Sequence, residues 1–208
     1  NGKKNLRNAL IYSDNIYFAQ AVLQIGEETF TDGLDKIKFN ENIEFVLPTS
    51  KSQYSNTEKI QSEATLADSG YGQGQVLVNP IHMASIYSAF VNDGNMIKPY
   101  LEYTENKTVE YLVENAFPKQ VADEIKEGLI QVVENPSGTG HDVKVDGITI
   151  AGKTGTAELK ASKDAEGDTL GWFDCFTTDQ STEDSLLIIS MAKNQKSSYL
   201  KRIIKTLF

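Results

Sequence analysis

I-T-I-A-G-K-T-G-T-A, residues 148–157, is the stretch that decides the fold of this chain. Ile148 and Ile150 alternate with Thr149, a pattern that predicts a half-buried strand. The glycines further along remove side chains from its second half, so another segment can approach the backbone closely. We therefore expect an edge strand whose backbone N–H groups can pair with an extended peptide.

The polar end of this stretch carries one cation and two hydroxyls, at Lys153, Thr154 and Thr156. An ammonium beside hydroxyl donors at the end of a strand can hold a carboxylate. The alternative is an ordinary strand that is interrupted by Gly152 and Gly155 and ends in a turn. Because a three-residue K-T-G sequence recurs by chance, the motif needs a second feature elsewhere in the chain.

That second feature is Ser13-Asp14-Asn15, which follows the apolar run 9–12 and precedes Lys153 by 140 residues. Helical periodicity on both sides predicts a loop pinned between two short helices. Such a loop can hold short polar side chains at the edge of a cleft. Alternatively, Ser13 and Asn15 simply cap the second helix.

The order S-D-N then K-T-G matches a signature of penicillin-binding proteins and serine β-lactamases. Between the two motifs, G-Q-G-Q at 72–75 is followed by Asn79-Pro80 and an apolar helical pattern from Ile81. With these motifs, residues 1–208 resemble the C-terminal two thirds of the transpeptidase domain of a class B penicillin-binding protein. Within that family the motif sequences are most similar to those of the low-affinity, methicillin-resistance type of Gram-positive bacteria.

The expected fold is a single α+β domain of the β-lactamase/transpeptidase type, incomplete at its N-terminal side. Three strands, including the K-T-G strand, should form an antiparallel meander after a helical region. Residues 40–59 are interpreted as a surface excursion, and 60–69 are left open between helix and loop. The expected helices are 6–11, 16–26, 27–37, 81–92, 117–133 and 199–208, and the expected strands are 96–101, 148–157, 171–176 and 186–191, with a hairpin arm at 143–147.

The resemblance implies a role for each matching residue. Ser13 would relay a proton to the leaving D-alanine or lactam nitrogen, and Asn15 would hydrogen-bond the catalytic lysine and the substrate amide. Lys153 would keep the site positive. Thr154, Gly155 and Thr156 would bind the substrate, the two threonine hydroxyls gripping its carboxylate. The Thr156 N–H would form half of the oxyanion hole.

The resemblance also implies a nucleophile from an S-x-x-K motif before S-D-N, but no serine precedes Ser13 here. We therefore expect the nucleophile to lie outside this chain and the isolated piece to be inactive. Two later S-x-x-K strings occur, at Ser190–Lys193 and Ser198–Lys201. The first lies in an expected strand, where positions i and i+3 face opposite sides. The second opens the last expected helix, where Ser198 is interpreted as an N-cap.

Three other functions stay open: a serine β-lactamase, a β-lactam sensor domain, and a non-catalytic fragment with only a structural or interaction role. A class A β-lactamase adds a glutamate that activates the deacylating water. None of the acidic candidates lies in an E-x-x-L-N context, and the G-Q-G-Q segment favours the peptidoglycan enzyme. The candidates are Glu28, Glu41, Glu44, Glu58 and Glu63.

Composition limits the partners. The net charge of −9 argues against a nucleic-acid partner. The single cysteine, Cys175, excludes an intrachain disulfide, and His82 is expected to be a core residue, so neither a metal nor a cofactor is expected. The resemblance implies peptidoglycan stem peptides, β-lactams and other cell-wall synthesis proteins as partners. It also implies a location on the outer face of the cell membrane, held by an N-terminal anchor outside this chain.

Overall fold

The computed structural model describes residues 5–57, 59–102, 104–105, 108–159, 167–179 and 185–208. The chain forms two compact units. We call Asn1–Asp14 with Glu124–Phe208 the sheet unit, and Asn15–Asp123 the helical unit. The expectation that all 208 residues make one domain stays a prediction.

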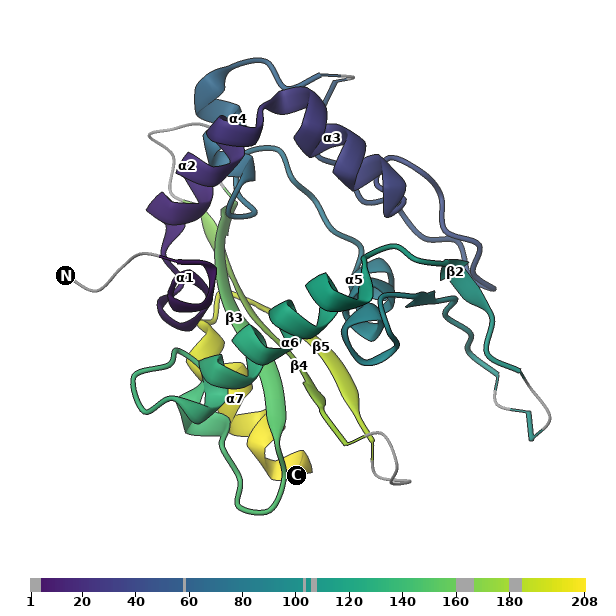
Figure 1. Cartoon of the computed structure of the whole chain (residues 1–208), viewed down its shortest axis with the longest axis vertical. Helices are drawn as coiled ribbons and strands as arrows, with labels where there is room; N and C mark the ends of the chain where they lie inside the picture. The colour runs from purple at the N-terminus through teal and green to yellow at the C-terminus, as the bar shows by residue number, and fades with distance from the viewer. Residues whose placement is uncertain (1–4, 58, 103, 106–107, 160–166, 180–184) are drawn as a thin grey trace. The chain divides into compact units, whose positions relative to one another are not determined.

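The sheet unit is built on an antiparallel meander, as predicted (Figure 1). Its strands are β3 (Ile150–Leu159), β4 (Asp168–Thr177) and β5 (Leu187–Lys193), in the order β3-β4-β5. The register pairs Lys153 with Asp174 and Phe173 with Ser190. Because directly opposed residues in an antiparallel ladder share a face, Lys153 and Asp174 leave the same side of the sheet.

The opposite face of the sheet is covered by α7 (Ser197–Ile204), which the sequence predicted as the closing helix. Leu200 and Ile204 of α7 pack against apolar side chains of all three strands. Cys175 of β4 is buried in this cluster, and burial raises the pKa of its thiol to about 12. The buried members of the cluster are Val133, Val143, Ile150, Phe173, Cys175, Leu200 and Ile204.

Two further helices complete the frame of the sheet unit. In α1 (Leu6–Tyr12), the Asn5 side chain caps the N-terminus by accepting the Asn8 N–H. The helix α6 (Lys119–Glu134) passes α1 at Gly128, where a Cβ would lie 2.5 Å from Leu10 Cδ1. Gly128 therefore allows the close approach that places α1 in the sheet unit. Leu129 and Val132 of α6, which lie in the sheet unit, are both buried.

The helical unit contains α2 (Asn15–Ile25), α3 (Glu27–Lys36), α4 (Glu63–Ser69) and α5 (Pro80–Ser88), with the short strands β1 (Met96–Ile97) and β2 (Tyr111–Val113). Pro80 begins α5, and the Asn79 side chain accepts the Ile81 N–H. Within residues 60–69, which the sequence left open between helix and loop, Glu63–Ser69 form α4. The core of this unit is Val22, Ile37, Phe39, Tyr54, Ile60, Leu66, Ile86, Ala89 and Met96.

The structure corrects part of the interpretation of residues 40–59 as a surface excursion: most of the described residues in this range are exposed, but the stretch 52–55 packs into the unit. Ile43, Ser52, Tyr54 and Ser55 are all buried, and Gln53 pairs with Leu77 in an isolated bridge. Short polar side chains allow this burial because they satisfy their own hydrogen-bonding groups. The Ser52 hydroxyl accepts the Asn79 N–H at 3.0 Å, for example.

Smaller differences lie in the helices and turns. Ile16 and Leu23 were expected on the buried face of α2 with Val22, but they are 62% and 42% exposed. The expected hairpin arm at 143–147 is a 3-10 turn at His141–Val143, followed by one bridge between Val145 and Ile148. The strand β2 was not predicted, because Tyr111–Val113 is too short for a two-residue alternation to stand out.

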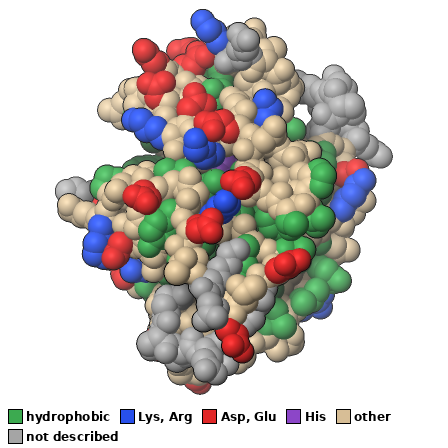
Figure 2. Space-filling model, turned by 90° about the vertical axis from the view of Figure 1, so that its right-hand side faces the viewer, with side chains coloured by type: hydrophobic (Ala, Val, Ile, Leu, Met, Phe, Trp, Pro, Cys, Tyr) green, Lys and Arg blue, Asp and Glu red, His purple; other side chains and the backbone are tan. Residues whose placement is uncertain are grey.

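The surface mixes charges of both signs. On the face in Figure 2, Lys and Arg side chains lie among Asp and Glu. Across the described ranges, no helix combines the length and apolar character needed to cross a membrane.

Candidate functional site

The S-D-N loop begins at the end of α1, where Ser13 takes a left-handed conformation with φ 51° and ψ 54°. Its backbone N–H bonds the Ala9 and Leu10 carbonyls and so closes the helix. A serine with positive φ is uncommon, and here it is fixed by the helix end that it terminates. Ser13 is therefore the C-cap of the first helix, whereas the alternative interpretation had made it a cap of the second helix.

Asn15 lies on the other side of the boundary between the two units and is the first residue of α2, with an exposed side chain. Ser13 and Asn15 are therefore held by different units. The sheet unit contains Ser13 and every residue of K-T-G.

The Lys153 ammonium joins the two motifs. Its Nζ donates to the Ser13 hydroxyl and, at 2.8 Å, to the Thr154 carbonyl. The Lys153 side chain is partly buried, and burial lowers the pKa of its amine to about 8. An amine with this pKa is mostly charged at pH 7 and can gain or lose a proton near that pH. The sequence predicted both motifs, and the fold brings their side chains into contact.

Thr154, Gly155 and Thr156 continue β3 beyond Lys153. Successive side chains alternate, so Thr154 and Thr156 share the face opposite to Lys153. A Cβ at Gly155 would lie 3.1 Å from the Trp172 Cβ, so a larger residue would crowd β4. Among the described residues, no strand pairs with the outer edge of β3. That edge is the one on which the sequence analysis placed an extended peptide.

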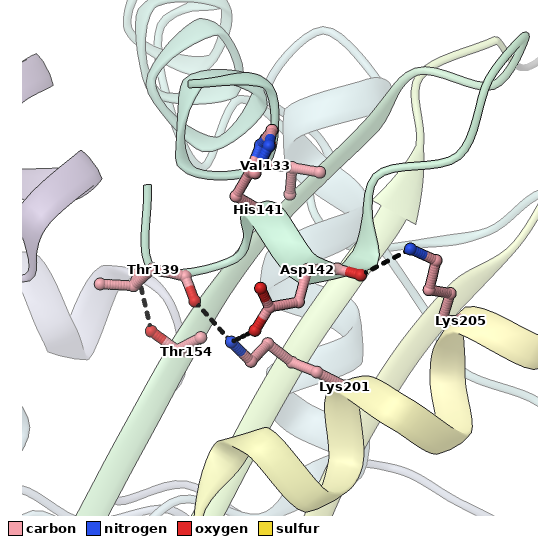
Figure 3. Close-up of polar contacts among 7 residues, drawn as sticks. All are labelled: Val133, Thr139, His141, Asp142, Thr154, Lys201 and Lys205. Atoms are coloured by element: carbon pink, nitrogen blue, oxygen red, sulfur yellow. Dashed lines mark hydrogen bonds and ion pairs between the residues drawn. The ribbon is translucent and has the colours of Figure 1, made fainter. Parts of the chain in front are cut away.

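Thr139, to which the sequence analysis gave no role, is hydrogen-bonded to the K-T-G strand. The Thr154 hydroxyl donates to the Thr139 hydroxyl at 2.9 Å, and the Thr139 N–H donates to the Ile11 carbonyl at 3.2 Å. Figure 3 shows Thr139 between Thr154 and Lys201 of α7. The available signal was the sequence G-T-G at 138–140, a hydroxyl between two glycines that lies 14 positions before Lys153.

Asp174 is a second residue that the sequence analysis missed. It is 5% exposed, lies opposite Lys153 in the ladder and accepts the Ser190 N–H at 3.1 Å. Burial raises the pKa of this carboxyl to about 7. The signal was present as an acid in the middle of the apolar strand G-W-F-D-C-F.

Neither later S-x-x-K string forms a serine–lysine pair. The Ser190 hydroxyl donates to the Phe173 carbonyl, while Lys193 forms an ion pair with Asp168 at 2.6 Å. Ser198 lies inside α7, whose N-cap is Lys196, so its interpretation as the cap was wrong. The helix begins two residues earlier than its apolar pattern indicated.

His82 is a core residue, as predicted. It is fully buried, and its two ring nitrogens bond the Ser52 hydroxyl at 2.8 Å and the Ile37 carbonyl at 2.7 Å. Burial lowers the pKa of its imidazole, so the ring is neutral at pH 7. In the ranges that the structure describes, no three His, Cys, Asp or Glu side chains are grouped so that they could hold a metal ion.

Comparison with known proteins agrees with these motifs. The family model of the penicillin binding protein transpeptidase domain matches residues 1–208. Penicillin-binding protein 3 of Bacillus subtilis is 44% identical over 191 residues, covering 91% of this chain and 28% of the relative. A probable peptidoglycan D,D-transpeptidase, PbpC of Pseudomonas aeruginosa, is 31% identical over 157 residues, or 76% of this chain and 27% of the relative.

A solved structure shares the fold. The D,D-transpeptidase domain of a peptidoglycan glycosyltransferase from Eggerthella lenta superimposes with a TM-score of 0.79 at 25% identity, covering 98% of this chain and 52% of that one. The predicted α+β, transpeptidase-like fold is thus confirmed. The chain spans little more than a quarter of the length of the curated relatives named here. Its full-length match to the family model shows that the chain belongs to the penicillin-binding protein transpeptidase family.

Proposed function

We propose that this chain is the C-terminal two thirds of the transpeptidase domain of a peptidoglycan D,D-transpeptidase. The observation that carries the proposal is the contact of Lys153 Nζ with the Ser13 hydroxyl, which unites two motifs 140 residues apart. A hydroxyl held by a partly buried ammonium is suited to pass a proton to a leaving amine, which acyl transfer from a peptide requires.

The proposed reaction has two acyl transfers. A serine hydroxyl from an S-x-x-K segment attacks the carbonyl of the penultimate D-alanine, and the bond to the terminal D-alanine breaks. Ser13 delivers the proton to the departing amine. An acceptor amine on a second stem peptide then attacks the ester, forming the cross-link and releasing the serine. With a β-lactam the lactam C–N bond breaks instead, and the serine stays acylated.

The remaining residues of the site would bind the substrate. The stem peptide would pair with the outer edge of β3, Thr154 and Thr156 would hold its terminal carboxylate, and Gly155 would let it approach the strand. Lys153 would supply positive charge, and the Thr156 N–H would donate one oxyanion hydrogen bond. Asn15, the first residue of α2, would bond the catalytic lysine and the substrate amide.

We further assign the chain to class B and to its low-affinity, resistance-like type. The support for this assignment is the sequences of the S-D-N, G-Q-G-Q and K-T-G segments. The relatives are more than three times as long as their matched segments. We therefore propose that the S-x-x-K motif and an N-terminal membrane anchor belong to the remainder of a longer protein. Its partners would be stem peptides, β-lactams and other cell-wall synthesis proteins at the outer face of the membrane.

The acidic residues considered for a β-lactamase give that alternative no support. Glu41 pairs with Lys38 and Glu44 with Lys98, each at 2.9 Å. Glu28 and Glu63 are exposed in the first turns of α3 and α4. Glu58 lies outside the described residues.

The test is intact-mass spectrometry after incubation with penicillin, on this chain and on the chain extended upstream to a complete S-x-x-K. We expect a drug-sized adduct on the longer protein only. A longer protein that stays unlabelled would overturn the proposal, and an adduct on this chain that maps to Ser198 would identify a different nucleophile. The decay of the adduct over hours separates a transpeptidase from a β-lactamase, since the latter releases the product rapidly.

A further inference from the structure

Lys201 of α7 is a buried cation that the proposed reaction does not use. The residue is 9% exposed, and its Nζ donates to the Thr139 carbonyl at 3.0 Å and to Asp142 Oδ2 at 2.8 Å. The Asp142 carboxylate is 75% exposed, and its hydrogen bond to Lys201 keeps its pKa below the usual range. Lys205, one turn along α7, donates to the Asp142 carbonyl at 2.9 Å (Figure 3).

Thr139, the residue that Lys201 holds, touches both halves of the site. Its N–H bonds the Ile11 carbonyl, two residues before Ser13, and its hydroxyl accepts from Thr154 of K-T-G. With its carbonyl bonded to Lys201, Thr139 is connected to α1, β3 and α7 at once. The position of Thr139 therefore determines where the Thr154 hydroxyl points.

Packing does not account for a lysine at this place. Its neighbours in α7, Leu200 and Ile204, fill the apolar cluster of the sheet unit, and an apolar side chain at 201 could extend that cluster. Burying the Lys201 ammonium is costly, and the Asp142 carboxylate, being 75% exposed, offsets only part of that cost. What an apolar residue cannot do is donate a hydrogen bond to the Thr139 carbonyl.

We propose that Lys201 is a positioning residue of the transpeptidase site. It holds Thr139, whose hydroxyl can rotate to donate to the Thr154 oxygen and so leave the Thr154 proton to bond the substrate carboxylate. The inference rests on the proposed function, because it assumes that Thr154 binds this carboxylate. It assigns the C-terminal helix a part in substrate recognition, although none of its residues is expected to touch the substrate. The lysine of the later S-x-x-K string thus acquires a role unrelated to Ser198.

The test compares Lys201→Met with Arg202→Met in the longer protein that includes S-x-x-K. Both variants lose one positive charge from α7, but Arg202 lies over the Tyr199 ring and is exposed. Acylation is measured with benzylpenicillin and with its methyl ester, which lacks the carboxylate. We expect Lys201→Met to slow acylation by the free acid roughly fivefold to tenfold, the scale of one misplaced hydrogen bond, and to leave the ester rate unchanged. Arg202→Met should change neither rate.

Two further variants keep the test decisive. Lys201→Arg retains a donor and should recover most of the rate with the free acid. Thr139→Val removes the hydroxyl acceptor, and the pair Lys201→Met with Thr139→Val should cost less than the sum of the single effects, because both act through one contact. Should Lys201→Met fail to fold, Thr139→Val against Thr139→Ser makes the same acid-to-ester comparison.

Equal losses with acid and ester, or no loss with the acid, would overturn the inference while leaving the proposed function standing. An unlabelled parent protein is a different result, since it removes the proposed function and this inference together.

Discussion

In the part of the chain that the structure describes, each unit contains a serine hydroxyl bonded to a basic side chain. Ser52 bonds His82 inside the helical unit, and Ser13 bonds Lys153 in the sheet unit. The first pair looks more like a catalytic serine and base, because histidine has the more suitable ordinary pKa. Yet the motifs and the family match point to the second pair.

The difference lies in access and in hydrogen-bonding capacity. His82 and Ser52 are both fully buried, His82 also bonds Ile37, and Ser52 also accepts the Asn79 N–H. Every polar atom of that pair is used within the fold, so it can bind no substrate. Ser13 and Lys153 are only partly buried, which leaves room for a ligand. A serine beside a base is therefore a structural element when both side chains are buried and all their hydrogen bonds are made within the fold. It is a candidate for chemistry when the two side chains are only partly buried.

The largest expected effect concerns the partly buried Ser13–Lys153 pair. Lys153→Met in the longer protein should reduce the rate of acylation by penicillin about 10²–10³-fold, because the charge and the proton path of the site are lost. The free energy of unfolding should change little, since the lysine is already partly desolvated. Stopped-flow acylation and urea unfolding measure the two effects. A large loss of stability with a normal acylation rate per folded molecule would show that the Ser13–Lys153 pair is a structural element, as the Ser52–His82 pair is expected to be.

The second effect concerns Asp174, the buried carboxyl on the sheet face of Lys153. Its native pKa of about 7 is above the ordinary value of 3.8, so the native state keeps a proton that the unfolded chain loses. This group therefore stabilises the fold most below pH 3.8, and its contribution is lost as the pH rises toward 7. Asp174→Asn should be more stable than the parent by about 4 kcal/mol at pH 8 and nearly equal to it at pH 4.

Urea unfolding, followed by the fluorescence of Trp172, reports on this strand directly, since it is the chain's single tryptophan. Asp168→Asn serves as a control, because Asp168 is partly exposed and paired with Lys193. A stability difference between Asp174→Asn and the parent that does not depend on pH would show that Asp174 stays ionised throughout.

The third effect concerns the buried Ser52–His82 pair. His82→Ala should lower the free energy of unfolding by about 3 kcal/mol, because it opens a cavity and strands the Ser52 hydroxyl and the Ile37 carbonyl. Acylation per folded molecule should not change. Circular dichroism during urea unfolding gives the stability, and titration with penicillin gives the folded fraction. A selective loss of acylation would mean that His82 belongs to the site.

His82 also predicts a pH dependence opposite to that of Asp174. Burial lowers its native pKa, so below pH 6.5 the unfolded chain binds a proton that the native state excludes. The parent should therefore lose stability as the pH falls below 6.5, and His82→Ala should lose less over the same range.

The smallest effect is an alkaline limit on the reaction. Because the Lys153 pKa is about 8, acylation should halve near pH 8 and fall by about tenfold at pH 9 if the ammonium is the active form. Lys153→Arg, which stays charged, should lack this limit even if its rate is lower. A flat profile between pH 7 and 9 in the parent would indicate that Lys153 keeps its ordinary pKa.

Local patterns in the sequence predicted most of the elements. Local patterns identified the three strands of the meander, and Asn79-Pro80 marked the start of α5. These signals are readable because strand periodicity, caps and left-handed turns depend on neighbouring residues. The exposed residues of α2 and the buried side chains at 52–55 were misjudged, because burial depends on which distant segment covers a face.

The sequence by itself determined the two motifs, their order and the strand and helix ends that carry them, and through these the family. Only the tertiary structure decided which side chains meet. It joined Lys153 to Ser13 across 140 residues, and it directed Lys201 to Thr139 rather than to Ser198 three positions away. The physical reason is that backbone periodicity is a local property, whereas the partner of a long flexible lysine is chosen by where the packed elements leave an acceptor within reach.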